Sequence, residues 1–138
     1  MVFSKILVPV DLTEKTAKAV EVARDLVAAE GDVVLLHVIE QLDTPFEEMN
    51  DFYEKLAVDA QVRMQEHVER LSEGGVRARA AIRIGKRARE IARFSHDEDF
   101  DLMVLYSHRL DPADLSHGLM TISHQVAIAA KCPVLLLR

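Results

Sequence analysis

The sequence predicts one α/β domain spanning residues 1–138, built on a doubly wound parallel sheet of five strands. Three observations predict it: short apolar runs without polar alternation, amphipathic segments between those runs, and the absence of a linker or internal repeat. Strands that alternate with helices form parallel sheets with right-handed crossovers and helices on both faces. The common strand order for five such strands is 3-2-1-4-5.

The chain is predicted to begin with a buried strand followed by a helix. Phe3–Val10 is a short apolar run typical of a buried parallel strand. Asp11 and Glu14 have the spacing of a capping box, with Thr13 as a rival cap. The helix is expected to carry Ala17, Val20, Ala23 and Val27 on its apolar face and to end at Gly31.

A second strand and a long helix come next. Asp32–Ile39 repeats the buried-strand pattern, and apolar residues at helical spacing run from Met49 to the stop at Gly74. Val76–Ile84 then alternates apolar residues with arginines, which is typical of a strand with one wet face. We expect this strand at an edge of the sheet, where charged side chains discourage aggregation.

The C-terminal part continues the same alternation. A helix opening at Gly85 is followed by the apolar strand Asp101–Ser107. After a polar loop, Ser116 is expected to cap a last helix, and Pro133–Leu137 forms the final strand.

The predicted strand order places a ligand crevice between the first and fourth strands. Ligands of doubly wound sheets bind at the carboxyl ends of the strands, where the strand order reverses. In this chain that position brings Pro9, Val10 and Asp11 opposite Ser107 and His108.

Composition excludes several classes of protein. The net charge of −6 argues against general nucleic-acid binding, which depends on clustered Lys and Arg. No stretch approaches the about 18 to 20 apolar residues of a membrane span, and the N-terminus shows no signal-peptide cleavage site. We therefore expect a cytoplasmic protein that does not associate with membranes. Cys132 is the only cysteine, so no internal disulfide forms, and we expect it to be buried.

Several motifs, taken in order, carry a family likeness. They are ILVPVDLT ending in Asp11, LLHVIE in the second strand, Gly85 before the third helix, DLMVLYSH and the closing AAKCPVLLLR. Over the whole chain this set resembles the universal stress protein family. The resemblance implies a Rossmann-like, adenine nucleotide alpha hydrolase-like fold, a role in the stress response, and a homodimer formed through the C-terminal strand Pro133 to Leu137.

The resemblance breaks at a glycine motif. Family members that bind ATP carry G-x-x-G, nine residues, then G-S or G-T after the fourth strand. Aligned from the C-terminal CPV, this chain has Tyr106, Arg109 and Met120 at the glycine positions, with Thr121 at the Ser/Thr position and one extra residue between. Side chains there would obstruct the phosphate path or forbid positive φ angles. We therefore expect weak or absent ATP binding, as in the branch of the family without the motif.

The base end of the family's site is retained. Asp11 resembles the residue that hydrogen-bonds the base, although it equally suits a helix N-cap. Val38 lies near the base, and Ser107-His108 keep the middle of the family's G-S-H-G turn. The candidate ligand-binding residues of this degenerate nucleotide crevice are Pro9, Val10, Asp11, Val38, Ser107, His108 and Thr121.

No pattern for catalysis or metal binding is found. The sequence has no nucleophile elbow, no H-E-x-x-H and no Walker loop. His117 and His124 lie two helical turns apart, about 10 Å, which is too far for both to bind one metal ion unaided. We expect no catalytic residue, no metal and no enzymatic activity.

The sequence thus favours a dimeric regulatory or binding module that acts on protein partners and requires no cofactor. One alternative is a nucleotide-binding switch, with ATP or AMP as ligand and weak or no hydrolysis, in which residues Lys86 to Arg93 supply positive charge for the phosphates. Another is an anion or RNA patch on the basic residues between Arg77 and Arg93, although that segment lacks aromatic residues for base stacking.

Overall fold

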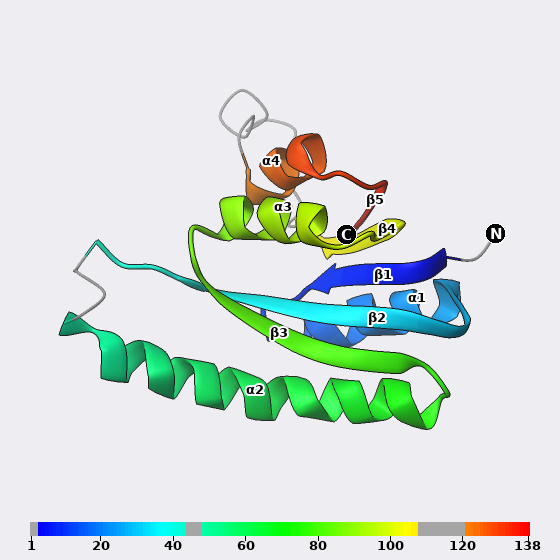
Figure 1. Cartoon of the computed structure of the whole chain (residues 1–138), viewed down its shortest axis with the longest axis horizontal. Coiled ribbons are helices and arrows are strands. Elements are labelled where there is room, and N and C mark those ends of the chain that lie inside the picture. The colour runs from blue at the N-terminus through cyan, green and yellow to red at the C-terminus, as the bar shows by residue number, and fades with distance from the viewer. Residues whose placement is uncertain (1–2, 44–47, 108–120) are drawn as a thin grey trace.

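The computed structural model describes residues 3–43, 48–107 and 121–138. Strands and helices alternate along these residues, as predicted (Figure 1). Their bounds are β1 Phe3–Pro9, α1 Lys15–Leu26, β2 Val27–Glu40, α2 Asn50–Glu73, β3 Arg77–Gly85, α3 Arg87–Asp97, β4 Leu102–Tyr106, α4 Ile122–Ala129 and β5 Val134–Leu137.

The five strands form one parallel sheet in the order β3-β2-β1-β4-β5, which confirms the predicted fold class and strand order. The pairing between β2 and β3 extends over nine residue pairs. By contrast, β1 and β4 pair only through Ile6 with Leu102 and Leu7 with Met103. Both strands continue beyond this ladder, so their carboxyl ends separate and leave space between them.

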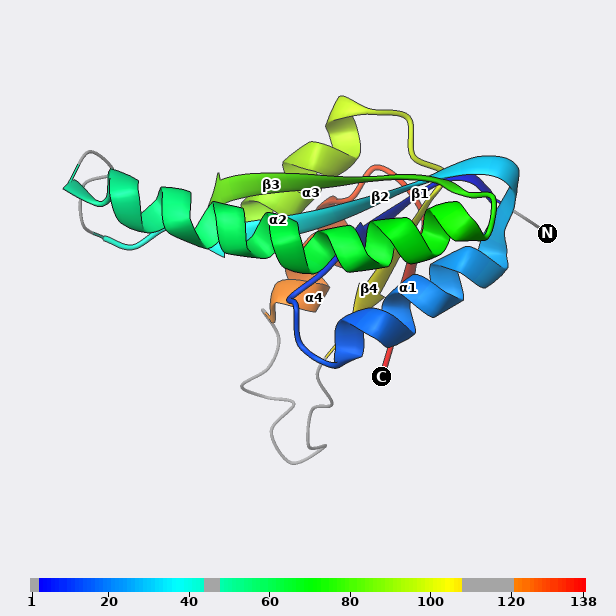
Figure 2. The same cartoon turned by 90° about the horizontal axis from the view of Figure 1, so that it is seen from below.

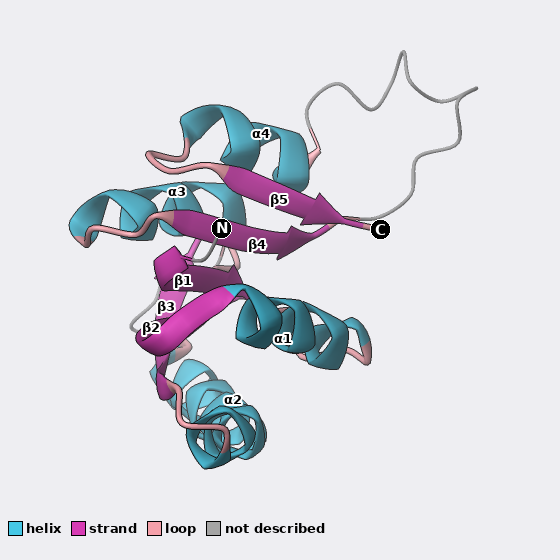
Figure 3. Cartoon of the chain, turned by 90° about the vertical axis from the view of Figure 1, so that its right-hand side faces the viewer, coloured by secondary structure: helices cyan, strands magenta, loops and turns pink. Residues whose placement is uncertain are grey.

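Each face of the sheet packs against its own pair of helices (Figure 3). Ile6 and Val8 of β1 point into a core shared with α1 and α2, whereas Leu7 points into a second core shared with α3 and α4. Because side chains alternate along a strand, a strand covered on both faces must be apolar at every position. This explains the uninterrupted apolar run from Ile6 to Pro9 in β1. Figure 2 shows α2 lying along β2 and β3 and extending past the end of the sheet.

The structure corrects the predicted end of the first helix. The helix ends at Leu26, and Val27 begins β2 with extended backbone (φ −77°, ψ 142°), paired with Phe3. Gly31 is therefore a strand residue, and a Cβ there would lie 2.9 Å from the carbonyl oxygen of Ser4. Glycine is required for this close approach of two backbones, not for ending a helix. The β-branched Val27 favours the extended conformation.

The capping box predicted for α1 does not form. Glu14 is the N-cap residue, but its side chain makes no capping hydrogen bond. Asp11 Oδ1 instead accepts hydrogen bonds from the Thr13 backbone N–H at 3.0 Å and the Thr13 hydroxyl at 2.7 Å. The rival cap, Thr13, accepts from the Lys15 N–H at 3.3 Å. The prediction was wrong because Asp11 bonds within its own turn, two residues along the chain.

The last helix begins at Ile122, later than predicted. Its cap is Thr121, whose backbone is extended (ψ 159°) and whose hydroxyl accepts a hydrogen bond from the His124 N–H at 3.2 Å. The expected cap, Ser116, lies outside the described residues. Because an extended residue interrupts a helix, α4 cannot run unbroken across Thr121.

Candidate functional site

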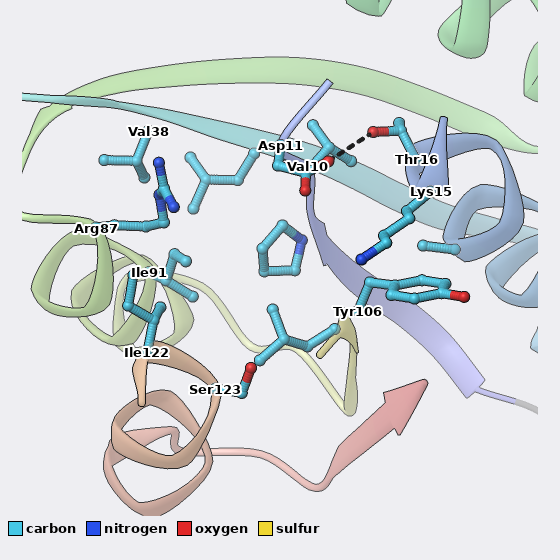
Figure 4. Close-up of a pocket in the computed structure, with 14 residues that line it drawn as sticks. Val10, Asp11, Lys15, Thr16, Val38, Arg87, Ile91, Tyr106, Ile122 and Ser123 are labelled. Carbon is cyan, nitrogen blue, oxygen red and sulfur yellow. Dashed lines mark hydrogen bonds between the residues drawn. The ribbon is translucent and has the colours of Figure 1, made fainter. Parts of the chain in front are cut away.

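The separated ends of β1 and β4 form the wall of a cavity of about 90 Å³ (Figure 4). Three strands (β1, β2 and β4) and three helices (α1, α3 and α4) contribute apolar side chains to it, and polar groups come from the segments that follow β1, β3 and β4. The lining residues are Pro9, Val10, Asp11, Lys15, Thr16, Ala19, Leu36, Val38, Arg87, Ile91, Leu105, Tyr106, Ile122 and Ser123. The cavity lies where the sheet topology predicts a ligand crevice.

Asp11 supplies the carboxylate of the cavity. Its Oδ1 accepts the two hydrogen bonds from Thr13 and a longer one from the Thr16 hydroxyl at 3.4 Å. Partial burial acts to raise the pKa of Asp11, but these hydrogen bonds outweigh it and hold the pKa below its ordinary value. Asp11 is therefore ionised at neutral pH. The hydrogen bonds from Thr13 and Thr16 all reach Oδ1.

Two cationic side chains face the same cavity from different helices. Lys15 begins α1, and its Nζ lies 5.5 Å from the centre of the Tyr106 ring. Arg87 begins α3, where its backbone N–H donates to the Glu40 carboxylate at 3.1 Å. Figure 4 places Arg87 beside Val38 and Lys15 beside Tyr106. Among the described lining residues, two cations face one carboxylate, although the chain as a whole is acidic.

The structure brings together four of the seven predicted site residues. Pro9, Val10, Asp11 and Val38 all line the cavity. The other described candidates lie next to it: Thr121 caps α4, and the Ser107 N–H donates to the Leu137 carbonyl at 2.8 Å. His108 lies outside the described residues.

Sequence reasoning missed Lys15, and it considered Arg87 only within the segment Lys86 to Arg93, as a source of charge for ligand phosphates. A signal was present for both, because each stands at the start of a helix that follows a predicted strand. Helices that follow parallel strands begin at the carboxyl edge of the sheet, so their first residues face any crevice there. The sequence does not show which way a side chain in that first turn points.

The arginines of β3 are paired with acids outside the cavity. Arg77 Nε lies 2.8 Å from Asp32 Oδ1, and Arg79 forms an ion pair with Glu98, which also binds Lys5 Nζ at 2.8 Å. These contacts neutralise part of the basic segment. They favour the interpretation of a solvated, locally balanced surface over an anion patch.

The remaining histidines and the cysteine show no features of a ligand site in the described part of the chain. His37, half-buried in β2, lies with Nδ1 2.9 Å from the Val10 carbonyl oxygen, as expected of a hydrogen-bonded core residue. Cys132 is buried, and burial raises the pKa of its thiol. His124 is exposed, while His117 lies outside the described residues. Within the described ranges, no three His, Cys, Asp or Glu side chains are grouped to bind a metal ion.

None of the described helices is both long and apolar enough to cross a membrane.

Solved structures similar to this chain share its architecture. A hypothetical protein named MJ0577 is 26% identical, with a TM-score of 0.82 over 99% of this chain and 96% of that one. A universal stress protein in complex with cAMP is 16% identical, with a TM-score of 0.71 over 100% of this chain and 98% of that one.

A universal stress protein family protein from Arabidopsis thaliana, with AMP bound, is 21% identical. The match has a TM-score of 0.69 and covers 97% of this chain and 90% of that one. At the level of sequence, the universal stress protein family matches residues 3–138. A match over nearly the whole length, together with the strand order and the crevice at the switch point, leads to one conclusion: the chain belongs to the universal stress protein family.

Proposed function

We propose that this universal stress protein is a dimeric regulatory module that acts through protein partners and binds adenine nucleotides only weakly. One observation carries the proposal. The cavity keeps the side chains of the base end, Asp11 and Val38, but its opposite wall contains the Tyr106 side chain, where the family's ATP-binding motif has a glycine.

The base end supports binding of an adenine base. Asp11 is ionised, so its carboxylate can accept a hydrogen bond from an exocyclic amino group. Val38, Leu36 and Ile91 supply an apolar surface for a purine ring. Two similar structures hold AMP or cAMP, which supports an adenine nucleotide as the ligand class.

The phosphate end supports weak binding. Tyr106 places a ring against the cavity, and the ring is held under the Lys15 ammonium. A phosphate-binding loop needs backbone N–H groups that approach the ligand closely, which small residues permit and an aromatic side chain hinders. The other two altered motif positions, Arg109 and Met120, lie outside the described residues.

The edge strand β5 supports a dimer. Leu135 and Leu136 are 37% and 36% exposed, and both are large apolar side chains. An apolar edge strand has unpaired backbone N–H and C=O groups that can bond to another strand. Pairing across a twofold axis would cover this edge. We propose that Pro133 to Leu137 forms this interface.

The described residues of the cavity also support a binding role over catalysis. They include the hydroxyls of Thr16 and Ser123 but no histidine or cysteine to serve as base or nucleophile. The alternative function, a nucleotide-operated switch with weak or no hydrolysis, is favoured by a different observation: Lys15 and Arg87 both face the cavity and can offset phosphate charge.

Isothermal titration calorimetry with ATP and AMP tests the proposal. We expect a dissociation constant for ATP weaker than about 10 μM, which corresponds to about 7 kcal/mol. Asp11→Ala should weaken whatever binding is seen, whereas Asp25→Ala, at an exposed position near the end of α1, should not. Tighter ATP binding would show that the altered loop still holds phosphates. An Asp11→Ala variant that binds like the native protein would rule out the assignment of the base end.

A further inference from the structure

The end of the cavity away from Val38 contains a side-chain cation that the family resemblance did not suggest. Lys15 is the first residue of α1 and is half-buried. Figure 4 shows its ammonium group pointing into the cavity beside the Tyr106 ring, with Ser123 across the space. The Nζ lies 5.5 Å from the ring centre, close enough for a cation–π contact that holds the side chain over the cavity.

The groups around this ammonium are suited to an anion. Ser123 is the second residue of α4, and the first amides of a helix have no acceptor within the helix. The N-terminal end of a helix also carries partial positive charge. Thus Ser123 of α4 and the Lys15 ammonium group of α1 line the same cavity from opposite sides, with the Tyr106 ring beside the ammonium.

We propose that Lys15 supplies the positive charge for the ligand phosphate, in place of a glycine loop, and that the preferred ligand is a nucleoside monophosphate. This inference rests on the proposed function, because it assumes that the base occupies the end near Asp11 and Val38. Lys15 then lies at the phosphate end, on the opposite side of the cavity from Arg87 (Figure 4).

The charges that line the cavity favour one phosphate over three. Of the two cations among the described lining residues, Arg87 lies at the base end beside Val38, which leaves Lys15 at the phosphate end. Lysine is a compact point charge that satisfies one phosphate group well. A triphosphate would bring further negative charge to a chain whose net charge is already −6. Among the described lining residues, a longer phosphate chain therefore adds repulsion without meeting a second cation at this end.

Titrations with adenosine, AMP and ATP separate the phosphate contact from the base contact. We expect the native protein to bind AMP more tightly than adenosine and at least as tightly as ATP. Lys15→Gln should weaken AMP binding by about tenfold and leave adenosine binding within about twofold, because the charged contact reaches only the phosphate. Lys15→Arg should retain most of the AMP affinity. Lys18→Gln, at an exposed position on the same helix, is the matched control.

The outcomes distinguish this inference from the proposed function. If Lys15→Gln weakens AMP and adenosine equally, or weakens neither, Lys15 is not the phosphate contact, although Asp11→Ala can still confirm the base end by weakening adenosine. Native binding of ATP several-fold tighter than AMP would also overturn the monophosphate preference. If the native protein binds neither adenosine nor AMP at millimolar concentration, both the proposed base end and this inference are wrong.

Discussion

The two edges of the sheet are protected in different ways. The edge strand β3 is nine residues long and alternates exposed arginines with apolar residues. The edge strand β5 has only four residues, all of them Val or Leu, and two of its leucines are more than one-third exposed. The comparison teaches that β3 is protected by its own side chains, whereas β5 would be covered by a second copy in the proposed dimer.

The protection of β3 comes from charges that are paired within the chain. Glu98, at the end of α3, binds Lys5 of β1 and Arg79 of β3. Arg83 lies over the Phe94 ring of α3 at 5.0 Å. These contacts hold long charged side chains on the outer part of the sheet, where a second strand would otherwise add.

The edge strand β5 differs from β3 because its outer backbone groups are flanked by apolar side chains. The carbonyls of Pro133 and Leu137 accept hydrogen bonds from Met103 and Ser107 of the neighbouring chain segment. Because successive residues of a strand point their backbone groups to opposite sides, those of Val134 and Leu136 face away from β4. An apolar strand with outward-facing donors and acceptors is suited to pairing with a second copy.

The largest effect is expected from giving β5 the charge that β3 has. Leu136→Lys should weaken the proposed dimer by about 30-fold or more, about 2 kcal/mol, because an unpaired ammonium would be buried at the interface. Sedimentation velocity over a concentration series measures the change. Val62→Lys, at an exposed position on α2, is the matched control and should leave association unchanged. An equally tight Leu136→Lys dimer would place the interface elsewhere, and a native protein that is monomeric at micromolar concentration would remove the dimer.

An intermediate effect is expected from removing the acid that holds β3 to β1. Glu98→Gln should lower the free energy of unfolding by about 1 kcal/mol at neutral pH, since the ion pairs are partly exposed. Hydrogen bonds from Arg79 and Lys5 lower the pKa of Glu98. The stabilisation is therefore present above the ordinary glutamate pKa and is lost as the pH falls through the lowered value.

Urea unfolding at neutral pH and near pH 3 measures this dependence. The difference between the native protein and Glu98→Gln should shrink toward acid pH. Asp99→Gln is the control, because its carboxylate is almost fully exposed and has one distant partner, Lys131 at 3.5 Å. A Glu98→Gln difference that stays constant with pH would contradict the ion-pair explanation.

The smallest effect is expected from removing a single arginine of β3. Arg83→Gln should lower stability by about 0.5 kcal/mol through loss of the cation–π contact with Phe94. It should not change the oligomeric state, because Arg77 and Arg79 remain charged on the same strand. Thermal unfolding and sedimentation check both expectations, with the exposed Arg89→Gln as control. New self-association of Arg83→Gln would show that protection of β3 depends on this one residue.

The fold was predicted well because the pattern of apolar residues in most strands indicates which of their faces are buried. The apolar run from Ile6 to Pro9 in β1 and the alternating run of β3 each identified both the element and its place in the sheet. The end of α1 was predicted wrongly because Val27 fits the helical period as well as it fits a strand. Only its pairing with Phe3 decides between the two, and that contact is not visible in the local sequence.

The site was predictable to the extent that topology determines it. Asp11 and Val38 were placed in the crevice because the strands that carry them end there. Lys15 was missed because the direction of a side chain in the first turn of a helix depends on how the preceding turn is built. Here that turn is shaped by the hydrogen bonds between Asp11 and Thr13, which the capping-box pattern did not anticipate.

The Tyr106 ring in the cavity wall also has a spectroscopic consequence. The chain has no tryptophan and two tyrosines, so its ultraviolet emission comes from Tyr53 and Tyr106 alone. Tyr53 is fully buried, and its hydroxyl accepts a hydrogen bond from the Leu42 N–H. Tyr106 lines the crevice and Tyr53 does not, so a ligand bound there would change the surroundings of Tyr106. The native protein thus carries its own fluorescent reporter for the crevice, and Tyr106→Phe removes that signal.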